Sequence, residues 1–240
     1  MSPHSNMIRQ KPLQILIKSR LKAVLLFLIL LATVPFPLMA ETALADTTFV
    51  LVADTNNPAD VTGIGSVREP FAIAKYDVTA SEYQEFLEAV EPSDAHGLYY
   101  PEMSSDPAVA CITNTIAADG IHYGVIAGRE KFPITYVSWP DAIRYCNWLQ
   151  HGRPTRENVT PETTETSSYT IGSDDAGNTT YALQTNALYF LPSRDQWHKA
   201  AYYRHDIKTY WTYPTSCNMA PGNSLTAGCA NEANYRTGDL

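Results

Sequence analysis

The sequence lacks the short motifs that identify the commonest catalytic classes. It has no Gly-x-Ser-x-Gly nucleophile elbow, no phosphate-binding loop and no dinucleotide-binding fingerprint. The histidines beyond residue 40 stand singly, without metal-ligand spacing, at His96, His122, His151, His198 and His205. Motifs therefore give no candidate catalytic residue and no reason to assign a hydrolase, a nucleotide triphosphatase or a dehydrogenase.

Cysteine is scarce, with four residues at Cys111, Cys146, Cys217 and Cys229. None of them forms a Cys-x-x-Cys pair, and no pair of histidines lies nearby, so the spacing does not predict a zinc site. In an oxidising compartment the four thiols could form up to two disulfides. Three pairings are compatible with four cysteines, and the sequence does not choose among them.

Positive charge is also scarce outside the N-terminus. The formal net charge is −8, from 17 basic and 25 acidic side chains, but the first 40 residues hold five basic side chains and no acidic one. The remaining residues therefore carry 12 basic against 25 acidic side chains, which is a net charge of −13. Such a body repels nucleic acid and anionic lipid, so neither is an expected partner.

Long apolar runs are absent except for one at the N-terminus. A basic segment, Lys11–Lys22, precedes an apolar run of twelve residues, Ala23–Val34, which is short for a membrane-spanning helix. Two small-residue cleavage sites follow, ending at Ala40 and Ala45. Residues 1–45 are therefore predicted to be a secretory signal peptide, or alternatively an uncleaved N-terminal anchor that is the chain's one connection with a membrane. Either reading predicts an exported protein of the periplasm, cell envelope or extracellular space.

What the rest of the chain has in abundance is a repeated strand-to-helix pattern. After a β-rich stretch at Thr47–Val52, the segment Phe71–Val78 predicts a strand. Thr79 and Glu82 then form a capping box, and apolar residues follow at helical spacing. The first unit of the pattern is therefore a strand that leads directly into a capped helix.

Two further copies of this pattern follow. Residues 133–139 (PITYVSW) predict a strand, with Ser138 as the helix N-cap and Asp141 three residues later. Residues 188–192 (LYFLP) predict another strand, followed by a capping box of Ser193 and Gln196. We expect the three helices to enclose one core, with Tyr83, Trp148 and Trp197 inside it. The polar segment between the last two copies, Arg153–Thr180, is predicted to be a long exposed loop.

Three segments in these units resemble the formylglycine-generating, or sulfatase-modifying factor, family. They are Lys75–Leu87 (KYDVTASEYQEFL), Val137–Leu149 (VSWPDAIRYCNWL) and Leu191–Tyr203 (LPSRDQWHKAAYY). They correspond to the family's EVTNxQYxxF, VSWxDAxxYCxW and LPTExEWExAAR segments, in the same order. The resemblance covers Thr47–Tyr235 and implies a sulfatase-modifying factor-like domain at residues 46–240.

The resemblance implies an α+β fold that is irregular, loop-rich and related to C-type lectin domains. Well-known members of the family oxidise a protein cysteine to formylglycine with molecular oxygen and copper held by two cysteines. Those cysteines follow GNVWEW-type and RGGSW-type segments, which have no counterpart before Leu240. The fold is therefore expected to be incomplete at the C-terminus, no catalytic residue is inherited, and copper is expected only if the C-terminal cysteines are present.

A weaker match within the resemblance concerns a structural calcium ion. Asn234 and Tyr235 correspond to the family's Ala-Asn segment, in which an Asn side chain and the next backbone carbonyl help bind calcium. Asp239 lies nearby and could supply a further oxygen ligand. The resemblance thus implies a calcium site at Asn234, Tyr235 and Asp239.

Three functions stay open on the sequence. The first is a formylglycine-generating oxidoreductase that acts on an exported protein or peptide substrate. The second is a non-catalytic, lectin-like binding module of the cell envelope. The third is a remnant without activity. The absence of catalytic residues favours the second over the first for the residues given.

Overall fold

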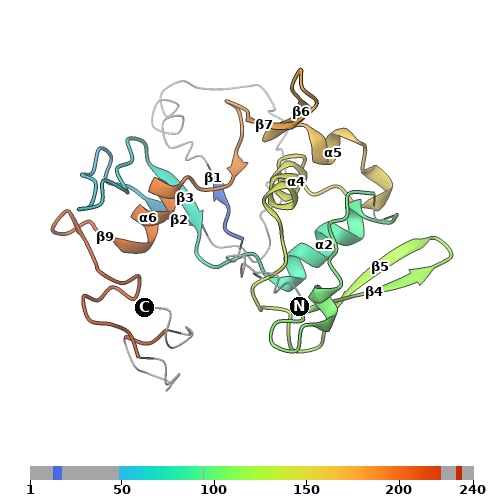
Figure 1. The fold of residues 1–240 in the computed structure, drawn as a ribbon, viewed down its shortest axis with the longest axis horizontal. Coiled ribbons are helices and arrows are strands. Elements are labelled where there is room, and N and C mark those ends of the chain that lie inside the picture. The colour runs from blue at the N-terminus through green and yellow to red at the C-terminus, as the bar shows by residue number, and fades with distance from the viewer. Residues whose placement is uncertain (1–12, 18–48, 94, 223–230, 234–240) are drawn as a thin grey trace, which may run out of the picture. The chain divides into compact units, whose positions relative to one another are not determined.

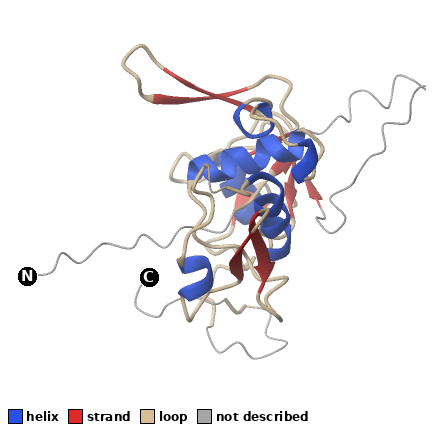
Figure 2. Cartoon of the chain, turned by 90° about the vertical axis from the view of Figure 1, so that its right-hand side faces the viewer, coloured by secondary structure: helices blue, strands red, loops and turns tan. Residues whose placement is uncertain are grey.

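The computed structural model describes residues 13–17, 49–93, 95–222 and 231–233 (Figure 1). The chain divides into two compact units. The first contains residues 1–50 and 72–191, and the second contains residues 51–71 and 192–240. Short antiparallel strand pairs and separate helices, joined by loops, make an α+β fold, as the sequence predicts (Figure 2).

The sheet of the first unit contains a strand from the N-terminal segment. Strand β1 (Leu16–Ile17) lies between β3 (Phe71–Ala74) and β8 (Tyr189–Phe190) and is antiparallel to both. Strand β2 (Phe49–Val52) comes where the chain passes from the first unit to the second. The predicted strands at Phe71–Val78 and 188–192 are thus present and shorter than expected, and the one at Thr47–Val52 is present over its described residues.

Strand β1 falls within the basic segment assigned to the predicted export signal. Leu13, Ile15 and Leu16 are buried, and their backbone bonds to β3 and the residues after it. The apolar run and both cleavage sites lie outside the described residues, so the export signal stays a prediction. No helix in the described part of the chain has the length and apolar character needed to cross a membrane.

Two capped helices form the core of the first unit. Helix α2 (Ala80–Val90) begins with the predicted capping box of Thr79 and Glu82. Helix α4 (Trp139–Gln150) begins at the predicted N-cap Ser138, which forms a capping box with Asp141. Between them lies a cluster of four aromatic side chains whose contacting rings have centroids 5.3–5.8 Å apart: Tyr83, Phe86, Tyr145 and Trp148. Burial of such large rings supplies much of the hydrophobic stabilisation of this unit.

The prediction of a strand at residues 133–139 is wrong. Pro133 has no backbone N–H to donate and forms only an isolated bridge with Thr79. Tyr136 has a φ of 61°, in the left-handed region, which interrupts an extended backbone. The segment therefore reaches α4 as an irregular connection.

The prediction of one long loop at Arg153–Thr180 is also wrong. The segment contains η1 (Arg156–Asn158), α5 (Glu162–Glu165) and the hairpin of β6 (Tyr169–Ser173) and β7 (Thr179–Leu183). Although the segment is polar, Thr163, Thr164 and Ser168 in it are buried. The Asn147 side chain donates a hydrogen bond to the backbone carbonyl of Thr164. A second hairpin joins β4 (Ile112–Ala117) to β5 (Gly120–Val125), after the short helix α3 (Glu102–Ser105).

The third predicted helix belongs to the second unit, so the expectation of one core enclosed by three helices is wrong. Helix α6 (Arg194–Tyr202) begins with the predicted capping box of Ser193 and Gln196, and Trp197 on it is half-buried. Strands β9 (Tyr203–Arg204) and β10 (Thr209–Tyr210) follow. The Lys199 ammonium donates to the carbonyls of Ala53 and Asp54, at 2.7 and 2.8 Å, and so ties α6 to residues 51–71.

Candidate functional site

Two cavities of the first unit lie along the polar face of α2. The larger has a volume of about 810 Å³ and the smaller about 600 Å³. Glu85 and Arg153 belong to the walls of both, so the cavities adjoin at this pair of side chains. We call the two together the α2 groove. Helix α2 contributes to its walls Ser81, Glu82, Gln84, Glu85, Glu88 and Ala89.

The Glu85–Arg153 ion pair lines both cavities. The guanidinium of Arg153 donates to a carboxylate oxygen of Glu85, and its carbon lies 5.6 Å from the centroid of the Trp148 ring. The backbone after α4 makes this contact possible, because Gly152 and Arg153 both have positive φ values, 82° and 59°. This left-handed turn reverses the chain and brings Arg153 back onto the helices.

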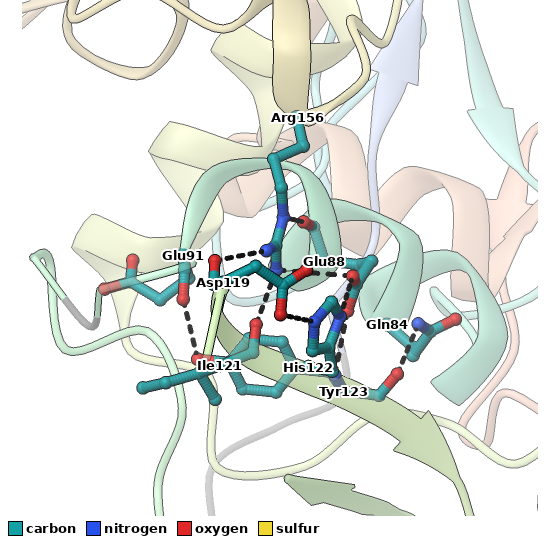
Figure 3. A network of polar contacts seen from close by, with 8 residues as sticks. All are labelled: Gln84, Glu88, Glu91, Asp119, Ile121, His122, Tyr123 and Arg156. Atoms are coloured by element: carbon teal, nitrogen blue, oxygen red, sulfur yellow. Dashed lines mark hydrogen bonds and ion pairs between the residues drawn. The ribbon is translucent and has the colours of Figure 1, made fainter. Parts of the chain in front are cut away.

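A polar network borders the smaller cavity (Figure 3). One oxygen of the Glu88 carboxylate lies 2.8 Å from His122 Nδ1, and the other accepts from the backbone N–H of Tyr123 at 2.8 Å. The second ring nitrogen of His122 lies 3.0 Å from a carboxylate oxygen of Asp119. Helix α2 and the β4–β5 hairpin are therefore joined by three ionisable side chains.

Arg156 completes this network from η1. It donates to the backbone carbonyls of Glu88, Asp119 and Ile121, and its guanidinium lies 3.3 Å from the Glu88 carboxylate. A guanidinium can do this because its N–H groups form a rigid planar fork. Arg156 therefore fixes the position of Glu88 at the edge of the smaller cavity.

The pKa values of two histidines in the first unit, His122 and His96, are shifted in opposite directions by their surroundings. Hydrogen bonds to Asp119 and, next, Glu88 raise the pKa of His122, since both carboxylates favour the imidazolium. The same contact lowers the pKa of Asp119. In contrast, burial lowers the pKa of His96, with the nearby Arg144 acting in the same direction. The network of His122 thus favours a protonated imidazole beside the ionised carboxylate of Asp119 at the edge of the groove.

The larger cavity combines an aromatic side chain with charges of both signs. Tyr76 is 65% exposed, and the Lys75 ammonium lies 5.2 Å from its ring centroid. Lys131 and Glu130 line the same cavity, and burial raises the pKa of Asp77 within it. Mixed charge and an exposed aromatic face suit a polypeptide segment better than a single small ion.

The cysteines in the described residues do not provide a copper site. Cys111 and Cys146 are buried, Cys217 is half-buried, and all three are free, so no disulfide joins the described cysteines, and Cys229 lies outside the described residues. Burial raises the pKa of the thiols of Cys111 and Cys146, which disfavours the thiolate that binds metal. Across the described ranges no group of three or more His, Cys, Asp or Glu side chains is arranged to hold a metal ion. These residues do not fit copper.

The calcium ligands implied by the family resemblance are Asn234, Tyr235 and Asp239, and all three lie outside the described residues. The calcium site therefore stays a prediction.

Local sequence patterns do not reveal the residues of the groove. Glu85 and Arg153 are 68 positions apart, and Glu88 and His122 are 34 apart, so no local pattern joins them. One signal was present: Ser81, Glu85 and Glu88 recur at helical spacing and mark a polar face of α2.

Residues 44–238 match a protein-family model described as the sulfatase-modifying factor enzyme 1-like domain. No curated protein and no solved structure matches the chain.

Proposed function

Because the chain belongs to the sulfatase-modifying factor family, we propose that its first unit is a binding module that takes an extended polypeptide segment in the α2 groove. The proposal assigns no chemical step to the described residues. It places the module among exported proteins of the cell envelope, with another exported protein as its partner.

The observation that carries this proposal is the sharing of Glu85 and Arg153 by two cavities. Each cavity has a volume in the range of small-ligand sites, about 300–1,000 Å³. Two such cavities that adjoin on one helix provide room for successive side chains of one bound segment. The ion pair that lines both offers the segment's backbone a carboxylate and a guanidinium, which can accept from its N–H groups and donate to its carbonyls.

Oxidation of a cysteine to formylglycine is not proposed for the described residues. That reaction in the family uses copper on two cysteines, and the thiols of Cys111 and Cys146 are enclosed in the core. A polypeptide ligand is nevertheless in keeping with a family whose well-known members act on a segment of another protein. The groove would then supply recognition alone.

A peptide array tests the proposal. The purified full chain is applied to overlapping peptides from exported proteins and, in parallel, to a glycan array. We expect selective retention on a subset of peptides and a loss of that retention in the Glu85→Lys variant, which puts a second cation beside Arg153. The matched control is Glu102→Lys, which makes the same charge change at an exposed position of α3.

Thermal melts of both variants establish that each is folded before the arrays are compared. Retention on the same peptides by wild type and the Glu85→Lys variant would remove the groove from the binding site. Retention on glycans alone would replace the proposed polypeptide ligand with a carbohydrate.

A further inference from the structure

Strand β1 lies between β3 and β8, so its removal would open the middle of this sheet. Leu16 pairs with Ile73 on one side and with Phe190 on the other. The backbone N–H groups of Ala74 and Val78 donate to the carbonyls of Ile15 and Leu13, at 3.0 and 2.8 Å. Five residues thus fill an inner position of the sheet, and we call the position that they occupy the strand slot.

Removal of these residues would take from the slot both its hydrogen-bond acceptors and the apolar groups that cover its surface. The N–H groups of Ala74 and Val78 would lose their acceptors, and unpaired buried backbone groups are costly. The apolar surface that now covers Leu13, Ile15 and Leu16, whose side chains are at most 7% exposed, would face water. An extended polypeptide with apolar side chains suits the slot, because its backbone carbonyls accept hydrogen bonds and its side chains cover the apolar surface.

The predicted export signal would cause this removal. Cleavage after Ala40 or Ala45 separates Leu13–Ile17 from the domain that begins with β2. A second processed copy has lost the same residues, so it cannot supply them either. An extended strand of a partner polypeptide can then enter the slot of the exported domain.

We propose that the strand slot between β3 and β8 is a strand-acceptor site, which takes an extended apolar segment of a partner polypeptide. Addition of a strand to exposed strand edges is a general mode of peptide recognition, in which backbone bonds give affinity and apolar pockets give specificity. Leu13–Ile17 shows a pattern that fits, with buried apolar residues at its first, third and fourth positions. The strand slot is a second binding site, distinct from the α2 groove. The slot binds through backbone hydrogen bonds and apolar contacts, whereas the groove presents charged side chains.

The two features adjoin in the first unit. Gln14 and Ile15 form part of the wall of the larger cavity of the groove. A partner strand in the slot would therefore pass beside the groove, although each feature can bind without the other.

The test uses the full chain with a specific protease site inserted among residues 18–48. The probe is a fluorescent peptide of residues 11–19 (KPLQILIKS), and the control peptide carries Ile15→Asp and Leu16→Asp. We expect the probe to bind the cut chain and not the uncut chain, whose own segment occupies the slot at a high effective concentration. The control peptide should bind about tenfold more weakly or worse, since each aspartate would bury a charge.

Hydrogen exchange then locates the bound probe. Exchange at the amides of Ala74 and Val78 should speed up after cutting and slow down again with the probe, while the amide of Glu91, at the end of α2, stays unchanged. Equal binding of the two peptides, or a cut fragment that never exchanges with the probe, would overturn the proposal. Concentration-dependent dimerisation that excludes the probe would also overturn it, by making a second copy the occupant.

The Glu85→Lys variant separates this proposal from the proposed function. It should lose array peptides and keep the probe. Loss of the probe alone, with unchanged array binding, would count against the strand slot and leave the groove in place.

Discussion

The side chain of Asn147 on α4 both donates to and accepts from the backbone of Tyr169 at the start of β6. Its amide nitrogen lies 3.0 Å from the Tyr169 carbonyl oxygen, and its oxygen accepts from the Tyr169 N–H at 2.7 Å. The same nitrogen donates to the carbonyl of Thr164. One fully buried amide therefore supplies three hydrogen bonds to a segment of polar composition.

We predict that Asn147→Ala destabilises the first unit by about 3 kcal/mol, because three buried backbone groups lose their partner. Asn114→Ala, at an exposed position of β4, is the matched control and should change stability by less than about 0.5 kcal/mol. Urea denaturation followed by tryptophan fluorescence measures both. Similar midpoints for the two variants would show that Asn147 does not hold residues 163–169 in place.

This residue also explains which parts of the fold the sequence could reveal. The predicted helix N-caps at Thr79, Ser138 and Ser193 are all formed, because each is a set of bonds within four residues. The hairpin at residues 169–183 is not predicted from local sequence, since its support comes from Asn147, 22 positions before Tyr169. A pattern within a few residues cannot show a hydrogen bond to a side chain so far away in the sequence.

The same distinction applies to the candidate site. Helical spacing marks Ser81, Glu85 and Glu88 as one polar face of α2, but it does not show what faces them. Arg153 meets Glu85 only because Gly152 and Arg153 adopt left-handed backbone after α4. The left-handed Tyr136 is a similar case, because it interrupts the strand that the sequence predicts at residues 133–139.

We predict that His122 and His96 titrate in opposite directions from the ordinary value of 6.5. Hydrogen bonds to Asp119 and Glu88 raise the pKa of His122, whereas burial lowers that of His96. NMR titration of the ring protons, with His122→Gln and His96→Gln variants for assignment, measures both. A His122 that titrates below 6.5 would show that its two carboxylate contacts are absent in solution.

The raised pKa of His122 also predicts a pH-dependent contribution to stability. Because its folded pKa lies above the unfolded value, the contribution is complete below about pH 6.5 and is lost as pH rises through the folded pKa. The lowered pKa of Asp119 acts at the other end, where stability is lost as pH falls through its folded pKa. The Tm difference between wild type and the His122→Gln variant should therefore shrink between about pH 6 and about pH 8. A constant or growing difference would contradict the linkage.

We predict that Cys217 is the most reactive of the three described cysteines. It is half-buried, whereas Cys111 and Cys146 are fully enclosed, and burial raises the pKa of both enclosed thiols. Because the thiolate is the nucleophile, both enclosed residues should resist alkylation in the native protein. Iodoacetamide labelling followed by mass spectrometry of the peptides measures each site, and labelling in denaturant supplies the full signal. Native labelling of Cys146 at the rate of Cys217 would contradict the buried position of Cys146 in α4.

In the second unit, we predict that Gly65→Ala is more damaging than Gly63→Ala by about 2 kcal/mol. Both glycines have positive φ values, 94° and 80°, so a side chain at either position strains the backbone. An added Cβ at Gly65 would lie 2.5 Å from the hydroxyl oxygen of Tyr210, whereas Gly63 has nothing within 4 Å. Tyr210 cannot move away cheaply, because its hydroxyl also bonds with the carbonyls of Pro58 and Gly65. The difference between the two variants in urea denaturation isolates the clash from the backbone strain, and equal stabilities would show that Tyr210 does not pack against Gly65.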